Sequence, residues 1–231
     1  MTSASSESTA LPTDRWASRE LAARTFLLAV SHDLRSPISV LSAVAELLKR
    51  RADVSEEAQE LVEMLAQSVT HIEHVIADLL DMERLADPSL EVVHRPTDLR
   101  LLVARCIADA RLRSRVVTEL PDERVLLDAG LLERILVNLL VNADRHNAEG
   151  GTITVTARSE GHQLTVTVDD EGPGIPDASK ERVFDLFAHG TDTGHGVGLY
   201  LVRRFAQLHG GDAHVLRSPN RGARLQVWLR T

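Results

Sequence analysis

Residues 15–85 carry apolar positions at helical spacing, interrupted at residues 50–55. In the second half of this region the steps alternate between four and three residues, the heptad pattern of a helix that packs in a bundle. The positions of this seam are Leu61, Leu65, Ser68, Ile72, Val75, Leu79 and Met82, flanked by Ala58, Val62, Val69 and Ile76. Ser55, followed by Glu56 and Glu57, is the expected N-cap.

The first helix of this region has an apolar face of its own. At about 100° per residue, one side collects Leu27, Val30, Leu34, Ile38, Leu41, Val44 and Leu48. Two helices cannot bury such wide stripes on each other alone. The hairpin is therefore predicted to pair with a second copy, giving a four-helix bundle and a homodimer. The alternative is that the hairpin docks onto the rest of its own chain.

A turn-rich link at residues 86–89 separates the hairpin from a region of mixed pattern. Helical spacing occurs at residues 98–113, 129–146 and 197–209, and strand-like alternation at residues 152–159, 163–169, 212–218 and 224–229. This predicts an α/β sandwich with helices on one face of a mixed sheet. The fold class is therefore α+β, with a polar, disordered leader at residues 1–14, the helical hairpin at 15–86 and the sandwich domain at 90–231.

Composition narrows the class of partner. Aromatic residues make up 3% of the chain, so the core must consist of Leu, Val, Ile and Ala. A net charge of −8 argues against a nucleic-acid partner, which needs a basic face. The single cysteine, Cys106, cannot form an internal disulfide, and no apolar stretch approaches the roughly 18–20 residues of a membrane span. We therefore expect a cytoplasmic protein without direct membrane insertion.

The first helix presents a histidine away from its apolar face. His32 lies roughly opposite that face, Asp33 follows it, and Pro37 removes the helical hydrogen bond to the Asp33 carbonyl, which predicts a local bend. Neutral imidazole is a nitrogen nucleophile, and a neighbouring carboxylate can accept its other proton or fix its tautomer. Because an exposed His beside an Asp is common on solvated helices, this pair alone does not establish catalysis.

The sandwich region contains a polar motif at the end of a predicted helix, NLLVNADRHN. Asn138 and Asn142 are four residues apart and share a helix face, and Arg145 and His146 follow within one turn. Amide oxygens are adequate ligands for Mg²⁺, and an arginine can contact a phosphate with two donors. The alternative is a polar helix face that ends in an Asn cap.

Two glycine-containing motifs follow. DDEGPGIP, with Asp170, Gly172, Gly174 and Ile175, comes after a strand, and its glycines permit close backbone approach. GHGVGLYLV opens a helix with Gly194, His195, Gly196, Val197, Gly198 and Leu199. Glycines before a helix N-terminus present amides and the helix dipole to phosphate oxygens. Neither is specific alone: the first is a turn after a strand, and the second lacks the Lys of a phosphate-binding P-loop.

The string SHDLRSP on a bundle helix resembles the phosphoacceptor box of two-component sensor histidine kinases. This resemblance implies that His32 is phosphorylated and that Asp33 acts as the general base. The family often has Thr or Asn four residues after the histidine, where it helps to dephosphorylate the partner. Ser36 stands there in this chain.

The three later motifs are similar, in order and spacing, to the ATP-binding domain shared by histidine kinases, DNA gyrase, mismatch-repair ATPases and a heat-shock chaperone. Phe184 and Phe187 match its aromatic segment, and the resemblance covers nearly everything after residue 15. It implies ATP and Mg²⁺ as cofactors, with Asn142 as metal ligand and Asp170 bonded to the adenine amino group. The implied function is an ATP-dependent histidine autokinase that passes the phosphoryl group to an aspartate of a response regulator receiver domain, with a separate sensor protein as a possible source of signal.

The chain departs from this family between Gly174 and Gly194, where it is shorter than most relatives. The basic residues there are Lys180 and Arg182, with His189, and His195 replaces a small hydroxyl residue. Few cationic contacts to phosphate are expected, so an alternative is a catalytically weak nucleotide-binding scaffold that regulates a partner. A second alternative, a serine kinase that binds a sigma factor on the same ATP fold, lacks the histidine hairpin.

Overall fold

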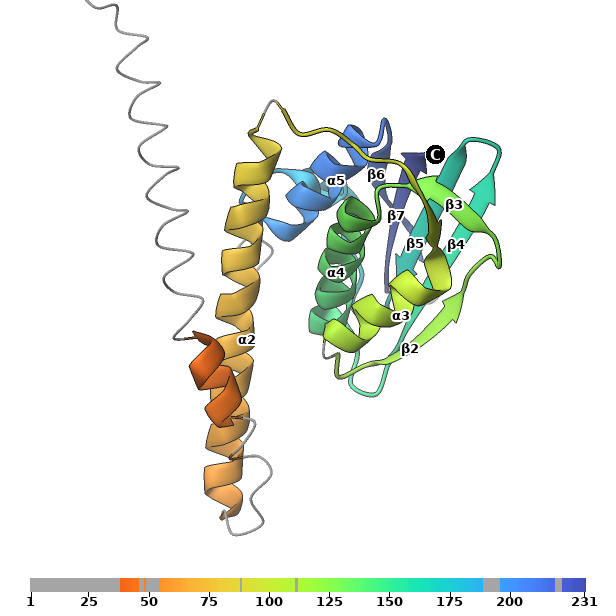
Figure 1. Cartoon of the computed structure of the whole chain (residues 1–231). Helices are drawn as coiled ribbons and strands as arrows, with labels where there is room; N and C mark the ends of the chain where they lie inside the picture. Colours follow the sequence, from red (N-terminus) through yellow and green to blue (C-terminus); the bar gives the residue numbers. More distant parts are fainter. Residues whose placement is uncertain are drawn as a thin grey trace, which may run out of the picture. The chain divides into compact units, whose positions relative to one another are not determined.

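A computed structural model describes residues 38–45, 48, 55–87, 89–110, 112–188, 196–218 and 222–231, with the side chains at 56, 57, 67 and 71 excepted. The chain divides into two compact units, Met1–Ala86 and Asp87–Thr231 (Figure 1). No helix in the described ranges is both long and apolar enough to cross a membrane. The predicted leader at residues 1–14 lies outside the described residues.

The first unit is built on one long helix, α2, which spans Glu56–Leu85. The predicted N-cap is confirmed, since Ser55 Oγ accepts a hydrogen bond from the Ala58 N–H at 3.3 Å. The one serine of the predicted seam, Ser68, donates its hydroxyl proton to the Met64 carbonyl of its own helix at 2.8 Å. A polar seam position therefore needs no partner outside α2.

A short helical stretch at residues 38–45 packs along α2 (Figure 1). Ile38 is buried against Val69 and Ile76, with Leu80 beside them. Across the same contact, Ser42 Oγ donates a hydrogen bond to Glu73 Oε1 at 2.9 Å. The apolar cluster and the Ser42–Glu73 hydrogen bond thus join these two helical segments.

As the sequence indicated, these two helices do not fully bury their apolar stripes on each other in the single chain. On the first, Leu41 and Val44 each remain 43% exposed. On α2 the buried positions are the flanking ones, Val62, Val69 and Ile76, whereas the seam positions Leu61, Leu65 and Ile72 are exposed. One neighbouring helix covers less than the full width of the apolar stripe. Apolar surface is therefore left on both helices.

The second unit contains a five-stranded mixed sheet in the order β2-β4-β5-β7-β6. Its strands are β2 Arg115–Glu119, β4 Thr152–Glu160, β5 Gln163–Asp169, β7 Ala223–Arg230 and β6 Asp212–Arg217. The β2–β4 pair is parallel and the other pairs are antiparallel. A separate antiparallel pair joins β1, Arg95–Asp98, to β3, Arg124–Leu127.

Three helices cover one face of this sheet, as predicted (Figure 1). They are α3 Leu99–Asp109, α4 Ala129–His146 and α5 Gly198–Leu208, and two short 3₁₀ turns, η1 Asp177–Ser179 and η2 Arg182–Phe184, precede α5. The core is formed by α4 side chains such as Leu136 and Leu139 and by alternate strand positions such as Val155 and Val227. The sequence predicted α4 and β5 with these bounds, but α3 ends earlier than expected and β1, β2 and β3 were missed.

Candidate nucleotide-binding site

The helix α4 places Asn138 and Asn142 on one half-buried face. Asn138 Nδ2 donates a hydrogen bond to the Arg134 carbonyl at 3.0 Å. Asn138 Oδ1 lies only 2.7 Å from the point where a Cβ on Gly198 would stand. Because Gly198 has no Cβ, the first turn of α5 can lie directly against the asparagine. The first and third predicted motifs therefore meet.

Asp170 directly follows β5, and its side chain is almost fully buried, at 3% exposure. Its Oδ1 accepts hydrogen bonds from the backbone N–H groups of Gly172 and Ala223, both at 2.9 Å. The Asp170 N–H in turn donates to the Ala223 carbonyl at 3.0 Å. A Cβ on Gly222 would overlap the Asp170 carbonyl oxygen, at 1.8 Å. The carboxylate is thus held rigidly by the start of β7, a contact that the sequence did not indicate.

The loop after Asp170 presses on the end of α4. A Cβ on Gly172 would stand 2.0 Å from the His146 carbonyl oxygen, so only glycine fits without a shift of the backbone. Gly174 has a φ of 77°, in the left-handed region that favours glycine. Ile175 follows, half-buried. Asn138, Asn142 and His146 are spaced by four along α4, so this helix brings all three motifs together.

Two polar groups on α4 remain available to a ligand. The Asn142 amide makes no hydrogen bond within the described part of the chain, and Arg145, which is exposed, forms no ion pair with any residue that the structure describes. By contrast, Lys180 Nζ pairs with Asp177 Oδ1 at 2.7 Å, and its hydrogen bond and charge lower the pKa of Asp177. Arg145 is therefore a better candidate for phosphate than Lys180.

Amide oxygens fit a Mg²⁺ ion that keeps water and phosphate oxygens as its other ligands. Asn142, whose side chain has no partner among the described residues, meets that need, and Asn138 lies one turn before it on the same helix. Within the described ranges, no group of three or more His, Cys, Asp and Glu residues could hold a metal. The described residues therefore do not form a metal site built from several carboxylates.

The aromatic segment is tied to α5 and β6 by residues that the sequence did not single out. Phe184 is buried, and the Arg203 guanidinium carbon lies 5.6 Å from its ring centroid. Arg203 also forms a two-pronged pair with Asp212, at 2.9 and 3.2 Å. Arg203 therefore links η2 to both α5 and β6.

Phe187 and Gly196 bracket the segment that precedes α5. Phe187 has a φ of 61°, unusual for a residue with a side chain, and donates its N–H to the Gly196 carbonyl at 2.9 Å. Gly196 has a φ of 65°, and a Cβ there would stand 2.7 Å from the Phe187 carbonyl carbon. Val197 is buried and Leu199 half-buried beyond it. The hydrogen bond between Phe187 and Gly196 therefore joins the two ends of this segment.

Several predicted residues lie outside the described residues. They are His32, Asp33 and Ser36 of the first helix, and Gly194 and His195 of the glycine motif. Their expected roles stay predictions.

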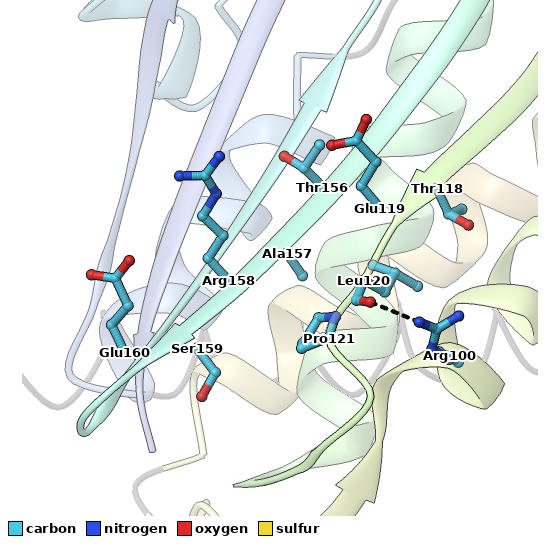
Figure 2. Close-up of a pocket in the computed structure, with 10 residues that line it drawn as sticks. All are labelled: Arg100, Thr118, Glu119, Leu120, Pro121, Thr156, Ala157, Arg158, Ser159 and Glu160. Atoms are coloured by element: carbon cyan, nitrogen blue, oxygen red, sulfur yellow. Dashed lines mark hydrogen bonds between the residues drawn. The ribbon is translucent and has the colours of Figure 1, made fainter.

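A separate hollow of about 540 Å³ lies where β4 runs on beyond the end of β2 (Figure 2). Its lining includes Thr156, Arg158 and Glu160 of β4, and Arg100, which donates a hydrogen bond to the Leu120 carbonyl at 3.1 Å. None of the predicted nucleotide residues lines it. The hollow is therefore distinct from the site around α4.

Two protein families match this chain. Residues 127–231 match the family described as histidine kinase-, DNA gyrase B- and HSP90-like ATPase, and residues 22–88 match the His Kinase A (phospho-acceptor) domain. The second range contains the region of the predicted phosphoacceptor, and the first contains every predicted ATP-site residue. The chain therefore has the two domains of a sensor histidine kinase core.

Relatives of this histidine kinase core are similar over most of its length. The alginate biosynthesis sensor protein KinB of Pseudomonas aeruginosa is 34% identical over 216 residues, which is 88% of this chain and 36% of KinB. The sensor-like histidine kinase SenX3 of Mycobacterium bovis is 30% identical over 229 residues, 93% of this chain and 55% of SenX3. The chain thus spans only about a third to a half of the length of these relatives.

Solved structures agree with the fold. Full-length ShkA in complex with AMPPNP is 27% identical with a TM-score of 0.62, covering 89% of this chain and 45% of that one. The mycobacterial sensor histidine kinase MprB is 26% identical with a TM-score of 0.54, covering 60% of this chain and 97% of that one. The combination of phosphoacceptor helices and an ATP-binding α/β domain is therefore shared.

Proposed function

We propose that this chain phosphorylates its own His32 from Mg²⁺–ATP and passes the phosphoryl group to an aspartate on the receiver domain of a response regulator. The observation that carries this proposal is the meeting of three motifs around α4. Asn138, in the middle of α4, lies against Gly198, and the His146 carbonyl, at the C-terminal end of α4, lies against Gly172. We assign residues 15–86 to the phosphotransfer hairpin and residues 90–231 to the ATP-binding domain.

The adenine base is recognised by the end of β5. The plane of the Asp170 carboxylate is set by the two backbone N–H groups that bond its Oδ1, so the group is ready to accept from an adenine amino group without reorganising. Gly172 and Gly174 permit close approach of the base, and Ile175 offers it an apolar contact.

The phosphates lie between α4 and the start of α5. Gly194, His195, Gly196, Val197, Gly198 and Leu199 present backbone amides and the N-terminal end of α5 to them. Arg145 supplies a cation, and His146 a further donor. Asn142 would hold Mg²⁺, with Asn138 one turn away, and the bound ion would neutralise charge on the phosphates.

The transfer itself needs a nucleophile and a base. Asp33 accepts the proton from one nitrogen of His32, while the other nitrogen attacks the γ-phosphorus. A nitrogen–phosphorus bond forms, the bond to the β-phosphate oxygen breaks, and ADP leaves. The receiver aspartate then takes the phosphoryl group from the imidazole.

The hairpin functions as a homodimer in the cytoplasm, where ATP and a receiver protein are available. The exposed apolar residues Leu61, Leu65 and Ile72 on α2 support this pairing, because a bundle of four helices would cover them. Ser36 occupies the position from which a hydroxyl can orient water for removal of phosphate from the regulator.

A second candidate function is a nucleotide-binding scaffold that regulates a partner without phosphoryl transfer. It is favoured by the small number of cations before the glycine motif, where Lys180 is already paired with Asp177. Weak contacts to the γ-phosphate would slow transfer while leaving base recognition intact.

Incubation with ATP labelled on the γ-phosphate distinguishes the two. We expect label on the wild-type chain, none on His32→Gln, and loss of the label in acid, which hydrolyses phosphohistidine but not phosphoserine. ATP binding without any label on the wild type would favour the scaffold. No binding of ATP at millimolar Mg²⁺–ATP would reject both.

A further inference from the structure

Asn147, directly after α4, connects the end of this helix to the loop that carries Asp170. It is the C-cap residue, with extended backbone at φ −64° and ψ 152°. Its Oδ1 accepts hydrogen bonds from the Glu171 N–H at 2.9 Å and from the Ala148 N–H at 3.1 Å. Asn147 itself is half-buried, whereas Glu171 and Ala148 are exposed. Asn147 therefore holds the residue that stands between Asp170 and Gly172.

The amide nitrogen of Asn147 bonds to a different part of the chain from the amide oxygen. Nδ2 donates to Ser114 Oγ at 3.0 Å. The Ser114 N–H in turn donates to Asp144 Oδ1 at 2.7 Å. Burial would raise the pKa of Asp144, but the hydrogen bonds from Ser114 and Arg113 outweigh it and the pKa is lowered. A fixed network thus orients the amide, with its oxygen toward Glu171.

The surrounding chain is shaped to admit this side chain. A Cβ on Gly151 would stand 2.7 Å from Asn147 Oδ1 and 2.9 Å from the Ala148 carbonyl oxygen. The turn after α4 therefore closes tightly around the amide only because residue 151 is glycine.

We propose that Asn147 is a positioning residue for nucleotide specificity, which sets the place of Asp170 relative to Asn138 and Asn142. This inference rests on the proposed function, since it takes Asp170 as the group that recognises adenine. Asp170 Oδ1 accepts from the Gly172 and Ala223 N–H groups, whereas the Glu171–Asn147 bond ties this loop through a side chain to the end of α4. Asn147 itself contacts no nucleotide.

The test compares four variants of the full chain. Asn147→Ala removes both polar atoms, and Asn147→Leu removes them at similar volume. Asn147→Asp keeps an oxygen for the Glu171 N–H, and Ser114→Ala removes only the acceptor of Nδ2. Equilibrium binding of ATP, GTP and tripolyphosphate separates base recognition from phosphate recognition. Hydrogen exchange of the peptide that contains Glu171 is measured without nucleotide.

We expect Asn147→Ala and Asn147→Leu to speed hydrogen exchange at Glu171 by about tenfold and to weaken ATP binding by about tenfold. Both effects correspond to the loss of one hydrogen bond. The preference for ATP over GTP falls by a similar factor, while tripolyphosphate binding changes by less than about twofold. Asn147→Asp and Ser114→Ala retain the preference, because each keeps an acceptor for Glu171.

Three results would overturn this proposal. They are an unchanged ATP to GTP preference in Asn147→Ala and Asn147→Leu, an equal loss of ATP and tripolyphosphate binding, or unfolding of both variants. A wild-type chain that binds no ATP would instead reject the proposed function, and a Glu171 exchange rate unaffected by Asn147→Ala would reject the positioning contact on its own.

Discussion

The backbone N–H of Asp128 donates a hydrogen bond to Nε2 of His209, at 3.2 Å. His209 Nδ1 lies 3.4 Å from the Phe205 carbonyl oxygen, so the ring is neutral with its proton on Nδ1. The imidazole is only 2% exposed and joins the end of α5 to the N-cap of α4. These are the two helices that carry the asparagine and glycine motifs.

This contact predicts that stability falls in mild acid. Burial lowers the pKa of His209 below its usual value. The Phe205 carbonyl and Asp128 raise this pKa, and His94, whose ring lies edge-on at 5.9 Å between centroids, lowers it further. In mild acid the imidazole is therefore protonated in the unfolded chain but stays neutral in the folded chain. The free energy of unfolding decreases as pH falls through about 6.5, by at most about 1.4 kcal/mol per pH unit.

Thermal unfolding of the full chain between pH 7.5 and 5.5 measures this effect. We expect His209→Gln to be less stable than wild type at pH 7.5 but to lose less stability on acidification. Equal pH slopes in the two proteins would assign the acid sensitivity to other groups.

Asp128 is predicted to be a strong stabilising cap of α4. Its Oδ1 accepts from the Gly130 and Leu131 N–H groups at 3.0 and 3.2 Å, and its Oδ2 accepts from the Val93 N–H at 3.0 Å. Asp128→Ala should cost about 1–2 kcal/mol in denaturant unfolding, the usual range for loss of an N-cap. Asp128→Asn, which keeps a capping oxygen, should lose clearly less; equal losses would argue against capping as the cause.

Substitution of Asp170 should affect nucleotide affinity, and substitution of its neighbour should not. Asp170→Asn removes the charged acceptor proposed for the adenine amino group, so ATP affinity should fall by about 10–100-fold, the value of one hydrogen bond to a charged group. Asp169 points to the other face of β5, where Arg224 binds it with two donors at 2.6 and 3.0 Å. Asp169→Asn is thus the matched control, and calorimetric titration with ATP should give it a near wild-type affinity. Similar losses in both variants would indicate damage to the sheet rather than to base recognition.

The apolar residues of α2 that the single chain leaves exposed should mediate dimerisation. Leu65 and Ile72 are 38% and 41% exposed, so changing both to Lys should leave the helix intact but oppose pairing. Sedimentation at micromolar concentration should show a dimer for wild type and for the control Gln59→Lys, and a monomer of unchanged helicity for the double variant. A double variant that remains a dimer would place the interface elsewhere.

The sequence by itself determined the elements whose information is local. The α4 helix runs from Ala129 to His146 as predicted, because a long apolar period and an Asp cap specify a helix without help from distant residues. Likewise β5 spans Gln163–Asp169 as its alternation indicated. The three nucleotide motifs were also recognisable, since each is a short run of residue types suited to one task.

Tertiary structure decided everything that depends on two distant segments. The strands β1 and β3 are each four residues long and pair only with one another, Arg95 opposite Leu127, so neither carries enough local signal to be predicted. The exposure of Leu41 likewise depends on how much of an apolar stripe a neighbouring helix covers. The bond from Glu171 to Asn147 exists because the end of β5 and the end of α4 are brought together by the packed core. Periodicity along a chain records which face of an element is apolar, but it contains no information on which partner that face will meet.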